Sequence, residues 1–136
     1  MSGELPRRET IVAKHLLVVL SNAHEGTDDE FNDWYTNTHI GDIIGLDGFQ
    51  AAQRYRLSDR QVGDGEGEAP PYRYLAIYEV DGDDLGRAAD SLASGVDSGM
   101  VISDALDRDR TVAWLFSAIT ERMEAGASTA SATSSR

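Results

Sequence analysis

The sequence contains no cysteine and no long apolar segment. The absence of cysteine excludes disulfide bonds, thiolate catalysis, and zinc or iron–sulfur sites with cysteine ligands. No apolar run approaches the roughly 20 residues that span a bilayer, and the N-terminal residues lack the apolar core of a signal peptide. We therefore expect a cytoplasmic protein that does not bind a membrane.

Positive charge is also scarce. Twelve Lys and Arg face 24 Asp and Glu, which gives a formal net charge of −12. Nucleic acids and anionic lipid surfaces are bound through Lys and Arg, and no basic cluster in the main part of the sequence interrupts the acidic pattern. The glycine-rich stretch at residues 63–67 is itself acidic and would repel phosphate. We therefore expect no nucleic-acid partner.

One segment places two aromatic side chains and an imidazole at helical spacing. Thr27 and Glu30 have the spacing of a capping box, which predicts a helix over about residues 28–44. Phe31, Tyr35 and His39 follow one another at intervals of four, so they share one helix face. An imidazole beside a phenol on an inward face is either a packed core group or the working part of a site.

Four apolar or alternating segments predict strands, and two amphipathic segments predict helices. The second strand is expected to place Phe49, Ala51 and Tyr55 on one face, with Arg54 and Arg56 on the other. The order β-α-β-β-α-β is typical of a ferredoxin-like α+β fold with a four-stranded antiparallel sheet. The expected strands are 11–20, 49–57, 72–80 and 111–119, and the expected helices are 28–44 and from about 84 to the start of an irregular region over 94–110.

The termini differ in composition from the rest of the chain. Residues 1–10 are polar, and residues 124–136 consist almost wholly of small and hydroxylated side chains. We expect a flexible N-terminus over 1–10, a single domain over 11–123 and a disordered tail over 124–136.

The first and fourth strands carry apolar residues on both faces, at 16–20 and 112–116. Strands of this kind are covered on both sides, but two helices can cover only one face of a four-stranded sheet. The sequence therefore predicts a homodimer in which two sheets pack face to face.

These segments resemble the dimeric α/β-barrel superfamily, and its EthD-like members in particular. The resemblance rests on the motif at 31–35 with His39-Ile40, on Gly48-Phe49, and on the segments 72–79 and 103–107. It covers about residues 11–123. The superfamily includes isomerases, lyases, cyclases, cofactor-free monooxygenases and haem enzymes, so the resemblance implies a fold and leaves the reaction open.

The resemblance also implies a ligand cavity between sheet and helices. Residues 14–20 are similar to the first strand of a plant polyketide cyclase of the superfamily, whose strand histidine faces that cavity. The later catalytic histidine of that cyclase has no counterpart here, because no histidine follows His39. Carried over by position, the residues expected to line the cavity are His15, Leu17, Val19, Phe31, Tyr35, Tyr74, Ala76 and Tyr78.

Imidazoles and phenols in an apolar cavity suit cofactor-independent acid–base chemistry on a small apolar or aromatic carbonyl or phenolic metabolite. His39 is the candidate general base, Tyr35 and Tyr74 its orienting or oxyanion partners, and His15 a second acid–base candidate. Trp34 flanks this pocket or packs at its edge. We expect no metal and no cofactor. The alternatives are that these residues form a packed core, that the cavity only binds a ligand, or that it binds haem.

Overall fold

The computed structural model describes residues 14–63, 70–80 and 85–126. The predicted flexible segment 1–10 and most of the predicted tail lie outside them. The described residues up to Ser117 form one compact unit, and the fold and site described below belong to it. In chain order the elements are β1 (His15–Ser21), α2 (Asp28–Trp34), the π-helical segment η1 (Tyr35–His39), α3 (Ile40–Ile44), β2 (Phe49–Arg56), β3 (Tyr74–Val80), α4 (Leu85–Asp97), the 3₁₀ helix η2 (Arg108–Arg110) and β4 (Val112–Ser117).

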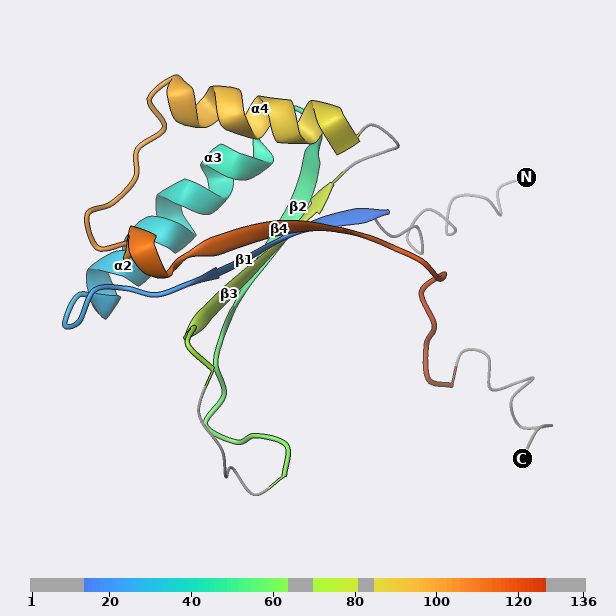
Figure 1. Ribbon diagram of the computed structural model, residues 1–136, viewed down its shortest axis with the longest axis horizontal. Coiled ribbons are helices and arrows are strands. Elements are labelled where there is room, and N and C mark those ends of the chain that lie inside the picture. Colours follow the sequence, from blue (N-terminus) through green and yellow to red (C-terminus); the bar gives the residue numbers. More distant parts are fainter. Residues whose placement is uncertain (1–13, 64–69, 81–84, 127–136) are drawn as a thin grey trace. The chain divides into compact units, whose positions relative to one another are not determined.

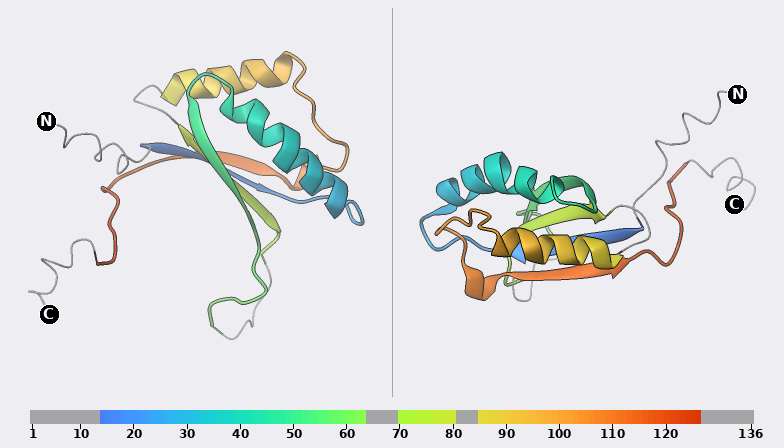
Figure 2. Two further views of the ribbon diagram at one scale, coloured as in Figure 1. Left: turned by 180° about the vertical axis from the view of Figure 1, so that it is seen from behind. Right: turned by 90° about the horizontal axis from the view of Figure 1, so that it is seen from above.

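The four strands form an antiparallel sheet in the order β2-β3-β1-β4, so the first and third strands are central. Helices α2, α3 and α4 cover one face of this sheet (Figures 1 and 2). This is the predicted β-α-β-β-α-β arrangement, and it confirms the ferredoxin-like α+β fold. We call the covered side the helix face and the opposite side the outer face.

Residues 28–44 are helical throughout, as predicted, but the start and the middle differ from expectation. Thr27 precedes the helix without a side-chain cap, because its hydroxyl donates to the carbonyl oxygen of His24 at 2.7 Å. The predicted capping box is therefore wrong. Residues Tyr35–His39 adopt a π-helical turn between the two α-helical parts. Such turns insert an extra residue into the helical repeat and are frequent at functional sites.

The second strand contains an irregularity that reverses part of its predicted pattern. The register shifts between Phe49 and Ala51, so Phe49 lies on the helix face together with Ala52 and Arg54. The predicted grouping of Phe49 with Ala51 and Tyr55 is wrong, because a bulge shifts the two-residue alternation by one position. Arg54 is thereby directed toward the helices, opposite Ala76 in β3.

Helix α4, which corresponds to the second predicted helix, also differs from expectation. It continues to Asp97, into the region 94–110 that was predicted to be irregular. Ala88 is fully buried against Gly48, and a Cβ at Gly48, which has φ +99°, would lie 2.9 Å from Ala88. The small residues at these two positions therefore let α4 approach the turn before β2 closely. The sequence predicts that Ala88 and Ala89 both face inward, but Ala89 is exposed.

The core lies on the helix face. In β3, buried and half-buried residues alternate as predicted, with Tyr74, Ala76, Tyr78 and Val80 directed at the helices. The outer face of the sheet is mainly apolar, and none of the described helices covers it. Its large apolar residues are Leu16, Val18, Leu20, Leu75 and Ile77, which are half-buried, and Tyr55, Trp114 and Phe116, which are exposed; Gln53 and Glu79 are its polar members.

Candidate functional site

The helix that begins at Asp28 places a group of aromatic rings on the sheet. Phe31 is fully buried, and its ring centroid lies 5.0 Å from that of Tyr74 and 5.5 Å from that of Tyr35. Trp34 packs edge-on against Tyr35 at 5.3 Å, and its indole N–H donates to the carbonyl oxygen of Val101. These four rings line one side of the space between helix and sheet. The four-residue spacing of Phe31 and Tyr35 predicted that both face the sheet.

His39 lies at the edge of this aromatic group. Its ring stacks on Trp34 with centroids 4.5 Å apart and meets Tyr35 edge-on at 4.9 Å. The Nδ1 atom is buried and has no hydrogen-bond partner. Burial lowers the pKa of His39 to about 4; nearby Asp42 opposes this shift, and the positive charge of Arg54 adds to it. The imidazole is therefore neutral at physiological pH.

Two phenols meet beneath the helix. The hydroxyl of Tyr78 donates to the hydroxyl oxygen of Tyr35 at 3.1 Å, and both side chains are buried. Burial raises the pKa of each phenol, an effect that the charge of Arg54 partly offsets. Both hydroxyls are therefore protonated at neutral pH, and the hydroxyl hydrogen of Tyr35 remains available to a further acceptor.

For Arg54 the sequence favoured a solvated side chain opposite Glu79, with a group that steers a carboxylate as the alternative, but the structure directs Arg54 into the aromatic group. Its guanidinium lies 4.5 Å from the ring centroid of Tyr35 and within 6 Å of two further rings, those of Phe31 and Tyr74. It donates to the hydroxyl oxygen of Thr36 at 2.7 Å and to the amide oxygen of Asn32 at 2.8 Å. Asn32 and Thr36 are four residues apart, beside Phe31 and Tyr35, and this polar stripe was the available signal for a half-buried cation.

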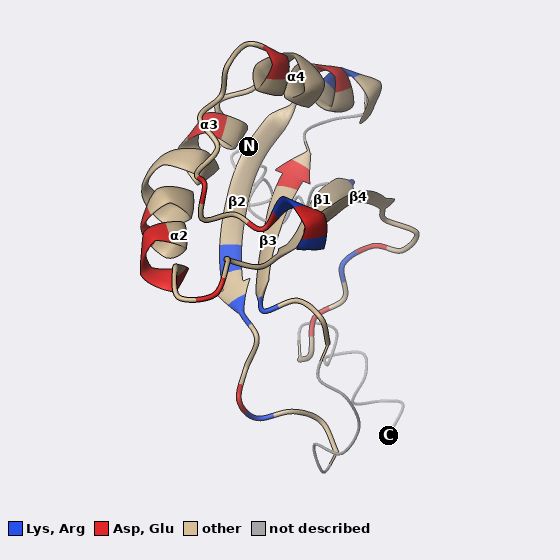
Figure 3. Ribbon diagram, turned by 60° about the vertical axis from the view of Figure 1, so that its left-hand side comes forward, with Lys and Arg blue, Asp and Glu red and all other residues tan. Residues whose placement is uncertain are grey.

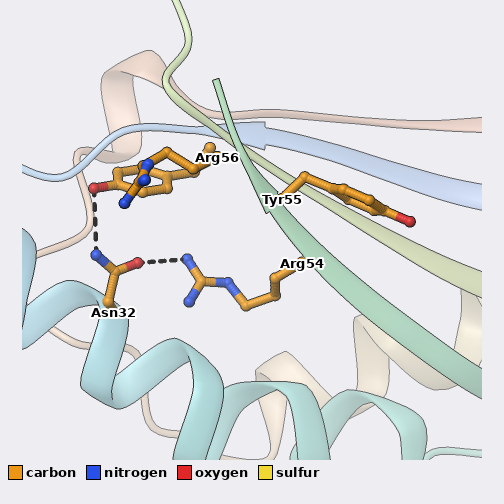
Figure 4. A pocket seen from close by; sticks show the side chains of 5 residues that line it. Asn32, Arg54, Tyr55 and Arg56 are labelled. Atoms are coloured by element: carbon orange, nitrogen blue, oxygen red, sulfur yellow. Dashed lines mark hydrogen bonds between the residues drawn. The ribbon is translucent and has the colours of Figure 1, made fainter. Parts of the chain in front are cut away.

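A cavity of about 200 Å³ opens beside Arg54, lined by Asn32, Arg54, Tyr55, Arg56 and Tyr74. Figure 4 shows Asn32, Arg54 and Arg56 on one side of β2, whereas Tyr55 is directed away from them. The Asn32 amide joins the site by donating to the Tyr74 hydroxyl oxygen at 3.3 Å. Tyr74 in turn donates to the carboxylate of Asp28 at 2.6 Å. Of the residues predicted from sequence to act chemically, Tyr74 is the one that lines this cavity.

The predicted acid–base residues fall into two groups. His39, Tyr35 and Tyr74 are linked through the aromatic contacts of Phe31 and Arg54. His15 lies at the other end of β1 from Ser21, the residue that pairs with Tyr74, and its Nδ1 hydrogen-bonds the Ser117 hydroxyl at 2.8 Å. At about 3.3 Å per residue, six residues of strand separate that position from Tyr74 by roughly 20 Å.

The remaining predicted lining residues lie in the sheet. Leu17, Ala76 and Tyr78 are buried on the helix face, and Val19 is half-buried beside Ala76. Among the residues that the structure describes, no three His, Asp or Glu side chains are grouped closely enough to hold a metal ion. None of the described helices is long and apolar enough to cross a membrane.

Comparison with known proteins gives structural but no sequence relatives. No protein-family model and no curated protein matches the chain. The chain resembles At3g17210 from Arabidopsis thaliana, with a TM-score of 0.56 and 12% identity over 80% of this chain and 99% of that one. It also resembles a dimeric ferredoxin-like protein of unknown function from Thermobifida fusca, with a TM-score of 0.50 and 13% identity over 79% and 92%.

A third solved structure is an EthD family protein from Bacillus halodurans, with a TM-score of 0.48 and 21% identity over 77% of this chain and 98% of that one. At these identities the similarities to the Arabidopsis thaliana and Thermobifida fusca structures concern the fold, which agrees with the strand order and helix placement described above. The chain has the ferredoxin-like fold that its sequence predicts.

Proposed function

We propose that this protein is an enzyme that carries out cofactor-independent acid–base chemistry on a small apolar or aromatic carbonyl or phenolic compound. The observation that carries the proposal is the His39 imidazole, which is neutral and has a buried Nδ1 without a hydrogen-bond partner. Buried polar atoms are nearly always paired, so an unpaired one calls for a functional account. A neutral imidazole has a free lone pair and is the form of histidine that accepts a proton.

The neighbouring groups suit the charge that would develop. When His39 removes a proton from a C–H beside a carbonyl, or from a phenol, negative charge forms on the substrate oxygen. The hydroxyl of Tyr35 and the guanidinium of Arg54 can both donate to such an oxyanion. The proton then returns from the imidazolium to another atom of the substrate, which leaves the enzyme unchanged. The His39 side chain is half-buried, so part of its ring faces solvent although Nδ1 does not.

We further propose that the chain acts as a homodimer in which two outer faces pack together. Trp114 and Phe116 are 59% and 56% exposed, and the apolar residues of β1 and β3 on the same face are only half-buried. Exposed apolar surface of this extent is typical of an interface. A second copy presents the same apolar surface, and the structural neighbour from Thermobifida fusca is described as dimeric.

The catalytic proposal is tested by a turnover screen with small aromatic ketones and phenols. His39→Ala should lower kcat/KM about 10²-fold or more, the usual contribution of a general base. The matched control is His24→Ala, which removes an exposed imidazole from the loop before α2 and should leave the rate unchanged. His15→Ala tests the second acid–base candidate. Equal rates for wild type and His39→Ala would overturn the assignment.

Two alternative functions, ligand binding without catalysis and haem binding, are tested alongside this screen. A protein that only binds its ligand should bind one of these compounds without turnover, and His39→Ala should then change affinity alone. A haem-binding protein should develop a Soret band on titration with haem, and His39→Ala should remove that band.

A further inference from the structure

The cavity beside β2 is positively charged in a strongly acidic protein. Arg54 and Arg56 stand two residues apart on the helix face of β2, with their Cα atoms roughly 7 Å apart. The cavity lining contains no Asp or Glu. Figure 3 shows these basic positions of β2 near the acidic start of α2. Two positive charges at this spacing together attract an anion more strongly than either does alone.

The acidic side chain that contacts Tyr74 of the cavity lining, Asp28, does not neutralise the pair. Asp28 accepts hydrogen bonds from Tyr74 and from Arg73, with which it forms an ion pair. Within the described residues, Arg56 forms no ion pair or hydrogen bond, and the Nε–H of Arg54 is buried without a partner. Guanidinium donors are therefore left over at the cavity.

We propose that this cavity binds the carboxylate of a small aromatic or similarly planar carboxylic acid. A guanidinium presents donors in a planar fork, which matches the two oxygens of a carboxylate. The Tyr74 ring forms part of the wall, and the Asn32 amide bridges Tyr74 to Arg54, so the fork is held in place. Arg54 also lies over Tyr35, so a bound carboxylate would place the rest of the molecule next to the aromatic group.

This proposal narrows the substrate class of the proposed function, and it rests on that function for His39 as the group that reacts with the substrate. A substrate anchored through its carboxylate would carry the carbonyl or phenol toward His39. The carboxylate subsite itself is a binding site, however, and its existence can be tested without any turnover.

The test is calorimetric titration with benzoate and with benzamide, its neutral isostere. Benzoate should bind the wild-type protein about tenfold or more tightly than benzamide, because charged hydrogen bonds are the stronger ones. Arg56→Gln removes an unpaired guanidinium and should weaken benzoate binding about tenfold without affecting folding. The matched control is Arg60→Gln, the same charge change in the exposed segment after β2, which should leave benzoate affinity unchanged.

Three results would overturn the proposal: equal binding of benzoate and benzamide, equal weakening by Arg56→Gln and Arg60→Gln, or inorganic phosphate binding more tightly than benzoate. The last would indicate an anion site that does not select a carboxylate. Benzoate binding and turnover together separate the two proposals. Benzoate binding by the wild-type protein, with no turnover of any compound by that protein, would leave the subsite standing and remove the catalytic role. Turnover that depends on His39 without benzoate binding would do the reverse.

Discussion

The two faces of the sheet use the same strands for different purposes. On the helix face, phenols, an imidazole and a guanidinium are packed among aromatic rings. On the outer face, β1 and β4 present aliphatic and aromatic side chains and β3 adds Leu75 and Ile77, with Glu79 as the charged member of that strand. Because successive residues of a strand point to opposite faces, one alternating sequence encodes both surfaces.

This difference between the faces shows where a small fold can hold polar functional side chains. A polar group on the helix face can find partners on the covering helices, as Arg54 does with Asn32 and Thr36. On the outer face, Glu79 finds its partner at the edge strand, since the Gln50 amide donates to its carboxylate at 3.3 Å. Apart from Gln53 and Glu79, the described strand residues of that face are apolar, which together with exposed Trp114 and Phe116 favours assembly through apolar contact.

The largest contrast between the faces should appear in stability. Phe31→Ala removes a fully buried ring that contacts three other aromatic rings and should lower the free energy of unfolding by about 3–5 kcal/mol. Trp114→Ala, in protein diluted until it is monomeric, should change that free energy by about 0.5 kcal/mol. Urea unfolding measures both. Equal losses would mean that the outer face is covered within a single chain.

The next contrast concerns assembly. Phe116→Asp places a charge on the outer face and should raise the dissociation constant of the dimer about 100-fold or more, because burying an unpaired charge costs several kcal/mol. Val96→Asp is the matched control, since Val96 on α4 is 50% exposed, close to the 56% of Phe116. Sedimentation velocity should show a dimer for wild type and Val96→Asp. A monomeric wild-type protein at micromolar concentration would contradict the proposed dimer.

A third experiment tests the buried imidazole through pH. The pKa of His39 is about 4 in the folded protein, below the 6.5 of the unfolded chain, so the unfolded chain takes up the proton first as the pH falls. Stability should therefore be full above pH 6.5 and decline toward pH 4, by about 2 kcal/mol when the partial exposure of the ring is allowed for. His39→Gln should remove this part of the decline, and His24→Gln should keep it. Unfolding curves measured between pH 4 and 8 would show whether the ring is neutral.

The sequence predicted the fold because its patterns are local. The alternation of residues 74–80 follows from one face being buried, and it holds along the whole of β3. From the sequence, a solvated Arg54 opposite Glu79 was favoured, whereas a bulge near Phe49 reverses the parity of the strand and places Arg54 opposite Ala76; no local pattern announces that shift. Its partners lie about 20 residues earlier, on a helix. Likewise, the Thr27 hydroxyl donates to the His24 carbonyl oxygen instead of capping the helix because the preceding loop places that carbonyl within reach.

The smallest expected difference between the faces is the effect of removing one phenol hydroxyl from each, that of Tyr78 on the helix face and that of Tyr55 on the outer face. Tyr78→Phe removes the donor to Tyr35 in the buried pair and should lower the free energy of unfolding by about 1 kcal/mol, the usual net value of one hydrogen bond. It should also raise the pKa of Tyr35 further, because that hydrogen bond lowers it. Tyr55→Phe makes the same change on the exposed outer face and should alter neither property. Urea unfolding and ultraviolet titration of the phenols measure the two effects. If the two variants behave alike, the phenol pair does not form in solution, and the oxyanion role proposed for Tyr35 loses its support.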